Sequence, residues 1–145
     1  QGTTRKRAAM TQAIIRKAIE TTLNTWAGTQ SLSAAWANRA FPPVNGTTYL
    51  RAFMLPIATL SQDLGREHRR YGGVFQVSIC LPIGTGPGAG EAIVSALATL
   101  FDPATPLTSD GLTIYILEPV SAAPAILEPD RYVIPCSLTY RADTY

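Results

Sequence analysis

The chain has 145 residues, with 12 Lys and Arg against 10 Asp and Glu and a net charge of +2. Charged residues make up 15% and apolar residues 46%, which excludes a disordered chain because enough apolar surface is available to form a core. The longest apolar stretches, residues 52–60 and 74–83, are interrupted by proline and are about half as long as a membrane-spanning helix of roughly 20 residues. We therefore expect one compact domain whose weakly polar surface is available to other protein copies.

The first nine residues carry the consecutive cations Arg5, Lys6 and Arg7, and they lack an apolar core of signal-peptide length. We interpret residues 1–9 as a leader, a tag remnant or a disordered arm, with a nucleic-acid-binding arm as the alternative. The single domain then extends over residues 10–145. The net charge of the whole chain, +2, is too small to attract nucleic acid or anionic lipid strongly.

Residues 10–26 predict an amphipathic helix. Apolar side chains recur at steps of three and four residues, at Ile15, Ile19, Leu23 and Trp26. Gly28 is a suitable stop for this helix. The next segment, residues 33–41, is short and is followed by two prolines and an Asn-Gly turn signal, so that it predicts a brief edge strand.

Two strands are predicted in the middle of the chain. Residues 48–60 are rich in strand formers, although Pro56 confines their second half to an edge or a bulge. Residues 74–83 alternate apolar side chains with small or polar ones. The intervening residues 61–73 contain several arginines and two glycines, and we expect them to form a long loop.

The second half begins with a glycine-rich loop at residues 84–90 and an amphipathic helix at residues 91–101. After a link at residues 102–110, two more strands are expected at residues 112–118 and 131–141, with a proline-rich loop between them. The order helix, strand, strand, helix, strand, strand predicts an α+β domain. We expect a sheet of about four strands, mostly antiparallel, with two helices packed on one face.

Two cysteines and one histidine are too few for a zinc site unless carboxylates join them at an unusual geometry, so we expect no metal. Cys136 falls on the apolar face of its strand, whereas Cys80 alternates with the apolar residues of its own strand. The two thiols therefore lie on different kinds of face. We expect them to be free, in a protein made in a reducing cytosol.

One pattern resembles a cofactor-binding motif. The glycines of residues 84–90 fit G-x-G-x-x-A between a strand and a helix, as in dinucleotide-binding folds. Such folds need several strand-helix-strand units and an acidic residue ending the next strand, whereas this chain has one unit and Asp110 precedes the strand. We therefore expect no enzyme activity, no catalytic residue and no cofactor. A nucleotide-binding enzyme that uses the Gly84 to Gly90 loop is the alternative from another class.

The segment of residues 66–71 is rich in arginine. It contains Arg66, His68, Arg69, Arg70 and Tyr71. Acidic neighbours reduce its charge to about +1, which is too weak for a nucleic-acid footprint. The arginines also disfavour the charged imidazole, which makes His68 a poor general base. We expect this segment to order against a neighbouring subunit, with a nucleic-acid-binding module as the alternative.

Several short motifs follow one another in a fixed order. They are Trp36-Ala37-Asn38 with Phe41-Pro42-Pro43, then Tyr49-Leu50-Arg51, Arg69-Arg70-Tyr71-Gly72-Gly73 and Phe75-Gln76-Val77. With the first helix, the glycine loop and the second helix, this order resembles the tail terminator-like proteins of long-tailed bacteriophages, small minor tail proteins similar to the lambda tail terminator. The resemblance covers residues 10 to 101, and the remaining residues match only in pattern.

The resemblance implies an α+β subunit that assembles with its own copies into a ring, usually a hexamer. The ring caps the finished tail tube, stops its polymerisation and offers a surface to the head-completion protein. No specific nucleic acid is implied, although DNA can pass through the ring. The protein is then expected in the virion tail of a phage or prophage, after synthesis in the bacterial host cytoplasm. Another head–tail joining (neck) protein is the alternative.

A ring of identical subunits is held by heterologous contacts, so each subunit needs two different adhesive surfaces. Unpaired strand edges and arginine-bearing loops can provide them. Our candidate residues for a subunit or partner interface are Trp36, Arg51, Arg66, His68, Arg69, Arg70 and Tyr71. Phe41 is expected to pack in the core instead, and packing under the sheet is the alternative for Trp36.

Overall fold

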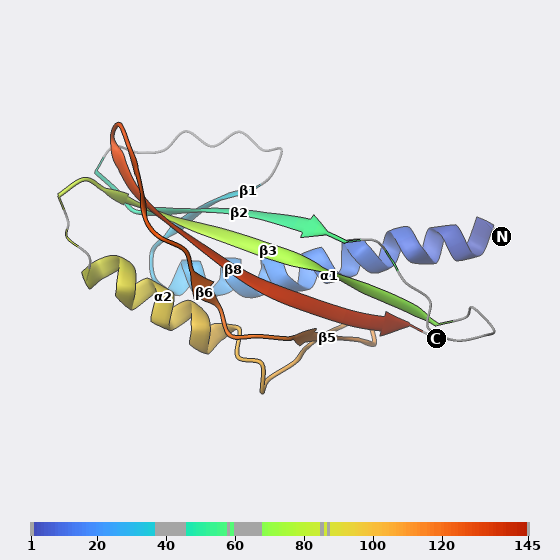
Figure 1. Ribbon diagram of the computed structural model, residues 1–145. Helices are drawn as coiled ribbons and strands as arrows, with labels where there is room; N and C mark the ends of the chain where they lie inside the picture. The colour runs from blue at the N-terminus through green and yellow to red at the C-terminus, as the bar shows by residue number, and fades with distance from the viewer. Residues whose placement is uncertain are drawn as a thin grey trace.

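The computed structural model describes residues 2–36, 46–57, 59, 68–84, 86 and 88–144, with side chains from Thr11 onward. Within these ranges the chain is α+β, as predicted, with helices α1 (Gly2–Thr29) and α2 (Gly88–Leu100) (Figure 1). The strands are β1 (Ser33–Trp36), β2 (Tyr49–Pro56), β3 (Arg69–Pro82), β4 (Leu107–Ser109), β5 (Leu112–Ile116), β6 (Ser121–Ala122), β7 (Ile126–Glu128) and β8 (Arg131–Thr144). The interpretation of residues 1–9 as a separate segment stays a prediction.

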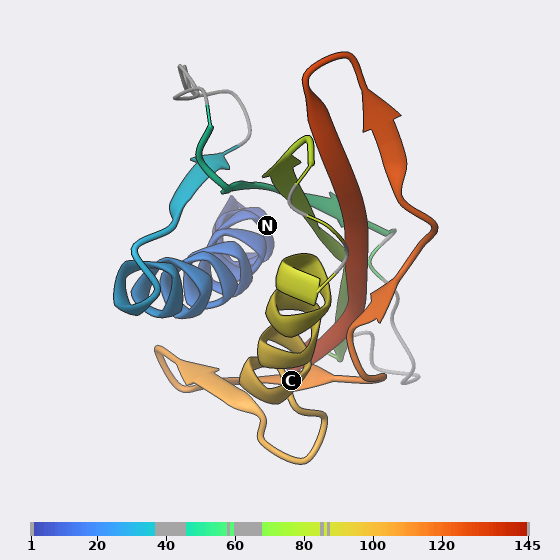
Figure 2. The same cartoon turned by 90° about the vertical axis from the view of Figure 1, so that its left-hand side faces the viewer.

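These strands form one mixed sheet in the order β1-β2-β3-β8-β5-β4, and β6 and β7 also pair with β8. β1 runs parallel to β2, whereas the other pairs are antiparallel. β3 and β8 have 14 residues each and pair along their whole length. The sheet twists and curls around the two helices (Figure 2).

The prediction of about four strands is wrong in number, because segments expected to be links contribute short strands. β4 forms within residues 102–110, and β6 and β7 form between the last two predicted strands. β5, β6 and β7 follow one another along the edge of β8 that β3 leaves free. Strands of two or three residues are too short to show alternation, so the sequence pattern could not reveal them.

The predicted loop also ends earlier than expected, because β3 begins at Arg69. Gly73 was expected in this loop, but it pairs with Tyr140 across the β3–β8 ladder. A Cβ atom on Gly73 would lie 2.6 Å from the Tyr140 hydroxyl, so the glycine makes room for this side chain in the middle of the sheet. Residues 61–67 of the predicted loop lie outside the described residues.

Both helices pack on the same, concave side of the sheet, as predicted (Figure 2). Ile15, Ile19 and Leu23 of α1 are fully buried, and Leu97 of α2 is 1% exposed. They share one core with the inward-facing side chains of β2, β3, β5 and β8. The ring of Phe101, just after α2, packs against that of Phe75 at a centroid distance of 6.3 Å.

Each helix begins earlier than predicted. α1 begins at Gly2 rather than Met10, and α2 begins at Gly88 rather than Glu91. Gly90 in the first turn of α2 lies so close to the sheet that a Cβ there would clash with side chains of β3 and β8. This glycine therefore lets the helix approach the sheet closely.

The two faces of the β3–β8 ribbon carry one cysteine each, as the alternation predicted. Cys136 faces the main core, whereas Cys80 lies on the outer face in a small cluster with Tyr49 and Val133. Both thiols are free and buried. Burial raises the pKa of Cys136 to about 11, so this thiol is protonated and unreactive at neutral pH.

Candidate assembly surfaces

Trp36 and Arg51 come together where β1 ends beside β2. Both line a shallow hollow, together with Phe53 and Met54. Trp36 is half-buried and packs against the core, while Arg51 points from the outer face of the sheet. β1 pairs only with the first four residues of β2. Within the described ranges, no strand lies beside the rest of that edge.

Arg51 forms an ion pair with a strand on the other side of the β3–β8 ribbon. Its guanidinium donates a hydrogen bond of 3.0 Å to Glu128 of β7, across β3 and β8. Next to this pair, Arg131 lies over the Tyr49 ring, 5.1 Å from its centroid, and donates to the Thr47 carbonyl oxygen. These contacts hold the start of β8 and its neighbour β7 to the outer face of β2.

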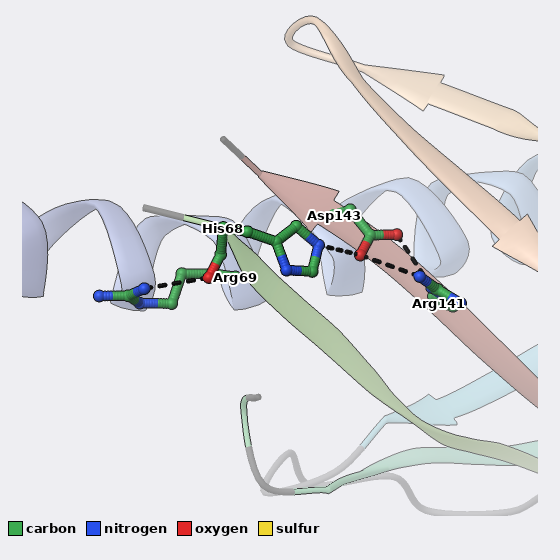
Figure 3. A network of polar contacts seen from close by, with 4 residues as sticks. All are labelled: His68, Arg69, Arg141 and Asp143. Carbon is green, nitrogen blue, oxygen red and sulfur yellow. Dashed lines mark hydrogen bonds and ion pairs between the residues drawn. The ribbon is translucent and has the colours of Figure 1, made fainter. Parts of the chain in front are cut away.

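A second polar cluster lies at the opposite end of the sheet, where β3 begins and β8 ends (Figure 3). The Nε2 of His68 lies 2.6 Å from Asp143 Oδ1, and Arg141 Nε donates a 2.9 Å hydrogen bond to Oδ2. Arg69 donates to the carbonyl oxygen of His68 at 3.0 Å. His68 is only 5% exposed, so Asp143 anchors a buried imidazole rather than a surface group.

Burial by itself would raise the pKa of Asp143, but hydrogen bonds from Arg141 and His68 outweigh this effect, and the pKa lies below its ordinary value of 3.8. Asp143 is therefore ionised at neutral pH and can only accept hydrogen bonds. It follows that His68 donates from Nε2. Sequence analysis missed Asp143 and Arg141, because the carboxylate that orders His68 is 75 residues away.

The remaining predicted interface residues fall into different environments. Tyr71 is 2% exposed and belongs to the main core, so within the subunit it supports the fold. Arg70 is half-buried on the outer face, where it pairs in register with Asp143. Arg66 lies outside the described residues. Contact of any of these residues with another subunit stays a prediction.

The outer face carries a group of exposed apolar residues that we call the sheet-face patch. It consists of Leu55, Ile57, Val74, Tyr115 and Leu117. Four of them are between 45% and 56% exposed, and Val74 is half-buried between them. They come from β2, β3 and β5 and from the residues that follow β2 and β5. Side chains of this size are normally covered when they gather on one face.

A second exposed group lies at the turn between β7 and β8, which we call the hairpin tip: Ile126, Leu127 and Asp130. Leu127 is 73% exposed and Ile126 is 53% exposed. They are neighbours in a strand, so their side chains point to opposite faces of the hairpin. The hairpin extends beyond the rest of the sheet, so that both of its faces are accessible (Figure 2).

Sequence analysis missed both groups, although one signal was present. Leu112, Ile114 and Ile116 face the core, yet the alternating positions Tyr115 and Leu117 are also large and apolar. A strand with one face on the core and the other in water is expected to carry polar residues at those positions. Apolar residues on both faces of β5 indicate that another protein surface covers the outer face.

The glycine loop has a structural explanation. Gly84 and Gly86 adopt positive φ angles of 91° and 77°, which turn the chain from β3 toward α2. β2 and β8 are the two strands that pair with β3, and both run antiparallel to it. A dinucleotide crevice forms instead between parallel neighbouring strands. The observed topology therefore gives the loop no such crevice.

The described part of the chain contains no group of three or more His, Cys, Asp or Glu side chains that could hold a metal ion. Among the same residues, no helix is long and apolar enough to cross a membrane.

Comparison with known proteins identifies the family to which the chain belongs. A family model described as phage tail terminator protein matches residues 14–140. This chain belongs to the phage tail terminator family. The match includes the packed faces of both helices, β3, the hairpin tip and β8 as far as Tyr140. The protein is accordingly a structural component of the phage virion tail, in agreement with the predicted resemblance.

The chain is also similar to proteins of known structure. Seven chains of known structure match, and one of them is 37% identical with a TM-score of 0.78. That match covers 92% of this chain and 96% of the other. No curated protein matches the sequence. The similarity to this structure therefore extends over almost the whole α+β domain and is not confined to one motif.

Proposed function

We propose that the protein assembles as a ring at the head-proximal end of the tail tube, ends tube polymerisation and presents the surface to which the head-completion protein binds. Membership of the phage tail terminator family carries this proposal. The ring is a homo-oligomer, with six subunits as the expected order. The enzyme alternative loses its support, because the glycine loop has a structural role and the family is a structural one.

The mechanism is geometric rather than chemical. A ring that matches the last ring of the tube covers the surface to which another tube ring would add. Its opposite surface then differs from the tube, so that a head protein binds there and a tube subunit does not. Such a mechanism needs large complementary surfaces, and the exposed apolar side chains on the sheet provide candidates for them.

Tube polymerisation in the presence of the purified protein tests this proposal. Tail tube protein is polymerised with increasing amounts of the chain, and tube lengths are measured by electron microscopy. The expected result is shorter tubes with a ring at one end, in a dose-dependent manner. Tubes of unchanged length without end rings would contradict the proposal. An unrelated protein of similar mass and charge is the control for non-specific effects.

A further inference from the structure

The residues of the sheet-face patch lie in two rows that cross β2, β3 and β8 and reach β5 and the segment after it. Leu55 pairs with Val74, and Val74 pairs with Thr139. The amide of Leu117 donates a 2.9 Å hydrogen bond to the carbonyl of Thr139, which extends this row into the segment after β5. Paired residues point to the same face, so these side chains form a row about 15 Å wide.

A second row runs beside the first. The amide of Ile57 donates to the carbonyl of Gly72 at 3.0 Å, and Gly72 pairs with Arg141. Arg141 in turn pairs with Tyr115. Gly72 has no side chain, and Ile57 leans over it, since a Cβ there would lie 3.3 Å from the Ile57 Cδ1. The patch therefore has apolar side chains at both sides of the outer face, two rows deep, with Thr139 and Arg141 of β8 between them.

The hairpin tip cannot reach the patch of its own subunit. Both lie along β8, the tip before Arg131 and the patch beside Thr139 and Arg141, roughly 30 Å apart at the rise of an extended strand. The pairing of β8 with β3 along its whole length fixes this separation. The two ends of the ribbon point in opposite directions (Figure 1). Only a tip from another subunit can cover the patch.

The charges at the two sites are complementary. At the tip, Glu128 is paired with Arg51 and Arg131 is 5% exposed, so the exposed Asp130 sets the local charge as negative. Beside the patch, Arg70 lies in register with Asp143, but it makes no ion pair or hydrogen bond with this or any other residue that the structure describes. The Arg70 position continues the outer face by one step beyond Gly72. Asp130 at the tip and Arg70 beside the patch thus carry opposite charges, next to apolar side chains at both sites.

From this complementarity we infer that the hairpin tip of one subunit docks on the sheet-face patch of the next, with Leu127 on the apolar side chains of the patch and Asp130 near Arg70. The contact is heterologous, since each subunit offers its tip to one neighbour and its patch to the other. The inference rests on the proposed ring and identifies the two surfaces that close it.

Chemical cross-linking tests the contact directly. In the doubly substituted variant Leu127→Cys with Leu117→Cys, a bis-maleimide reagent should join successive subunits into a ladder that extends past the covalent dimer. Each single variant should give no ladder, because only one of the two surfaces carries a reactive thiol. The native Cys80 and Cys136 are 0% and 1% exposed, so the wild-type chain is the background control. Dimers from Leu127→Cys alone would indicate tip-to-tip contact and overturn the inference.

Charge reversal tests the pairing of Asp130 with Arg70. Arg70→Glu and Asp130→Arg should each weaken assembly on tail tubes at least about tenfold, and the double variant should restore it, because each ring contact then regains opposite charges. Glu20→Arg on α1 makes the same change in charge as Asp130→Arg, away from both surfaces, and should assemble normally. Circular dichroism and thermal unfolding of each variant show whether the subunit is folded.

The outcomes separate this inference from the proposed function. If wild-type rings form and both single reversals assemble equally well, the ring stands and the tip-to-patch contact is wrong. If the reversals form normal rings that no longer bind tubes, the patch contacts the tube protein and the inference is also wrong. If wild-type protein neither forms rings nor binds tubes, the proposed function fails together with the inference.

Discussion

Gly73 occupies a crowded position between β2 and a tyrosine of β8. A Cβ atom there would lie 2.6 Å from the backbone oxygen of Leu55 and 2.9 Å from the Cα of Pro56. Backbone atoms cannot move away cheaply, so we expect Gly73→Ala to lower the free energy of unfolding by about 2–3 kcal/mol. Urea denaturation followed by circular dichroism measures this change.

Gly28→Ala is the matched control for this substitution. Gly28 lies in α1, and a Cβ there would meet no atom within 4 Å. Because alanine favours the helix over glycine, the free energy of unfolding should stay the same or rise by up to about 1 kcal/mol. Equal stability of Gly73→Ala and the wild-type chain would show that the sheet is not crowded as described.

Asp143 makes the free energy of unfolding of the subunit depend on pH in the acidic range. Its folded-state pKa is lower than the ordinary 3.8, so its stabilising effect is complete above that value and disappears as the pH falls through the folded-state pKa. Asp143→Asn should lower the free energy of unfolding by about 1–3 kcal/mol at pH 5, since His68 and Arg141 lose a charged acceptor.

The pH series distinguishes this effect from a general loss of packing. Unfolding of both chains is measured at several values between about pH 5 and pH 2. The difference between wild type and Asp143→Asn should shrink toward the acid end, where the wild-type carboxyl is also neutral. A difference that is constant over the whole range would contradict the assignment of the ionised Asp143 as the hydrogen-bond acceptor.

At the scale of single residues, the alternation of apolar and polar side chains predicted which face of a strand each side chain takes, including the separation of Cys80 from Cys136. The partner of His68 could not be predicted from the sequence, because Asp143 follows 75 residues later and its position depends on the register of β3 with β8. Register is set by the pairing of the whole ribbon rather than by the residues near His68.

At the scale of elements, α2 is held to the sheet by a narrow apolar stripe. Leu97 is 1% exposed and joins the core formed with β3 and β8. Leu97→Ala removes most of this buried side chain, so we expect the free energy of unfolding to fall by about 2–5 kcal/mol. Thermal unfolding and urea denaturation both report the change.

Thr99→Ala is the control on the same helix. Thr99 is exposed, and its hydroxyl donates only to the Ser95 carbonyl within the helix. Alanine is at least as good a helix former, so stability should change by no more than about 0.5 kcal/mol. A comparable loss in both variants would mean that helix propensity, and not the core contact of Leu97, sets the stability of α2.

The long elements were predictable from the sequence and the short ones were not. Both helices and the strands β2, β3, β5 and β8 lie where the apolar periodicity places them, because each buries a repeated face in one core. β4, β6 and β7 form by pairing at the sheet edge, and nothing local in their residues requires a strand. The hairpin tip was therefore missed as a unit.

At the scale of the whole molecule, the low charge of 22 ionisable Lys, Arg, Asp and Glu residues among 145 has a structural counterpart. The outer face of the sheet carries Leu55, Ile57, Tyr115 and Leu117 where an isolated domain would carry charged side chains. Sequence analysis predicted a surface for other copies but placed it on the arginine-rich segment. The described structure adds an apolar patch beside that segment, which only the pairing of distant strands assembles.

The central claim is that this protein sets where the tail ends. The most direct measurement is the distribution of tail lengths, by electron microscopy, in lysates of a phage that lacks the gene. The proposal predicts tails of uncontrolled length without attached heads, and normal length on complementation with the wild-type chain. Tails of normal, uniform length in the absence of the protein would contradict it.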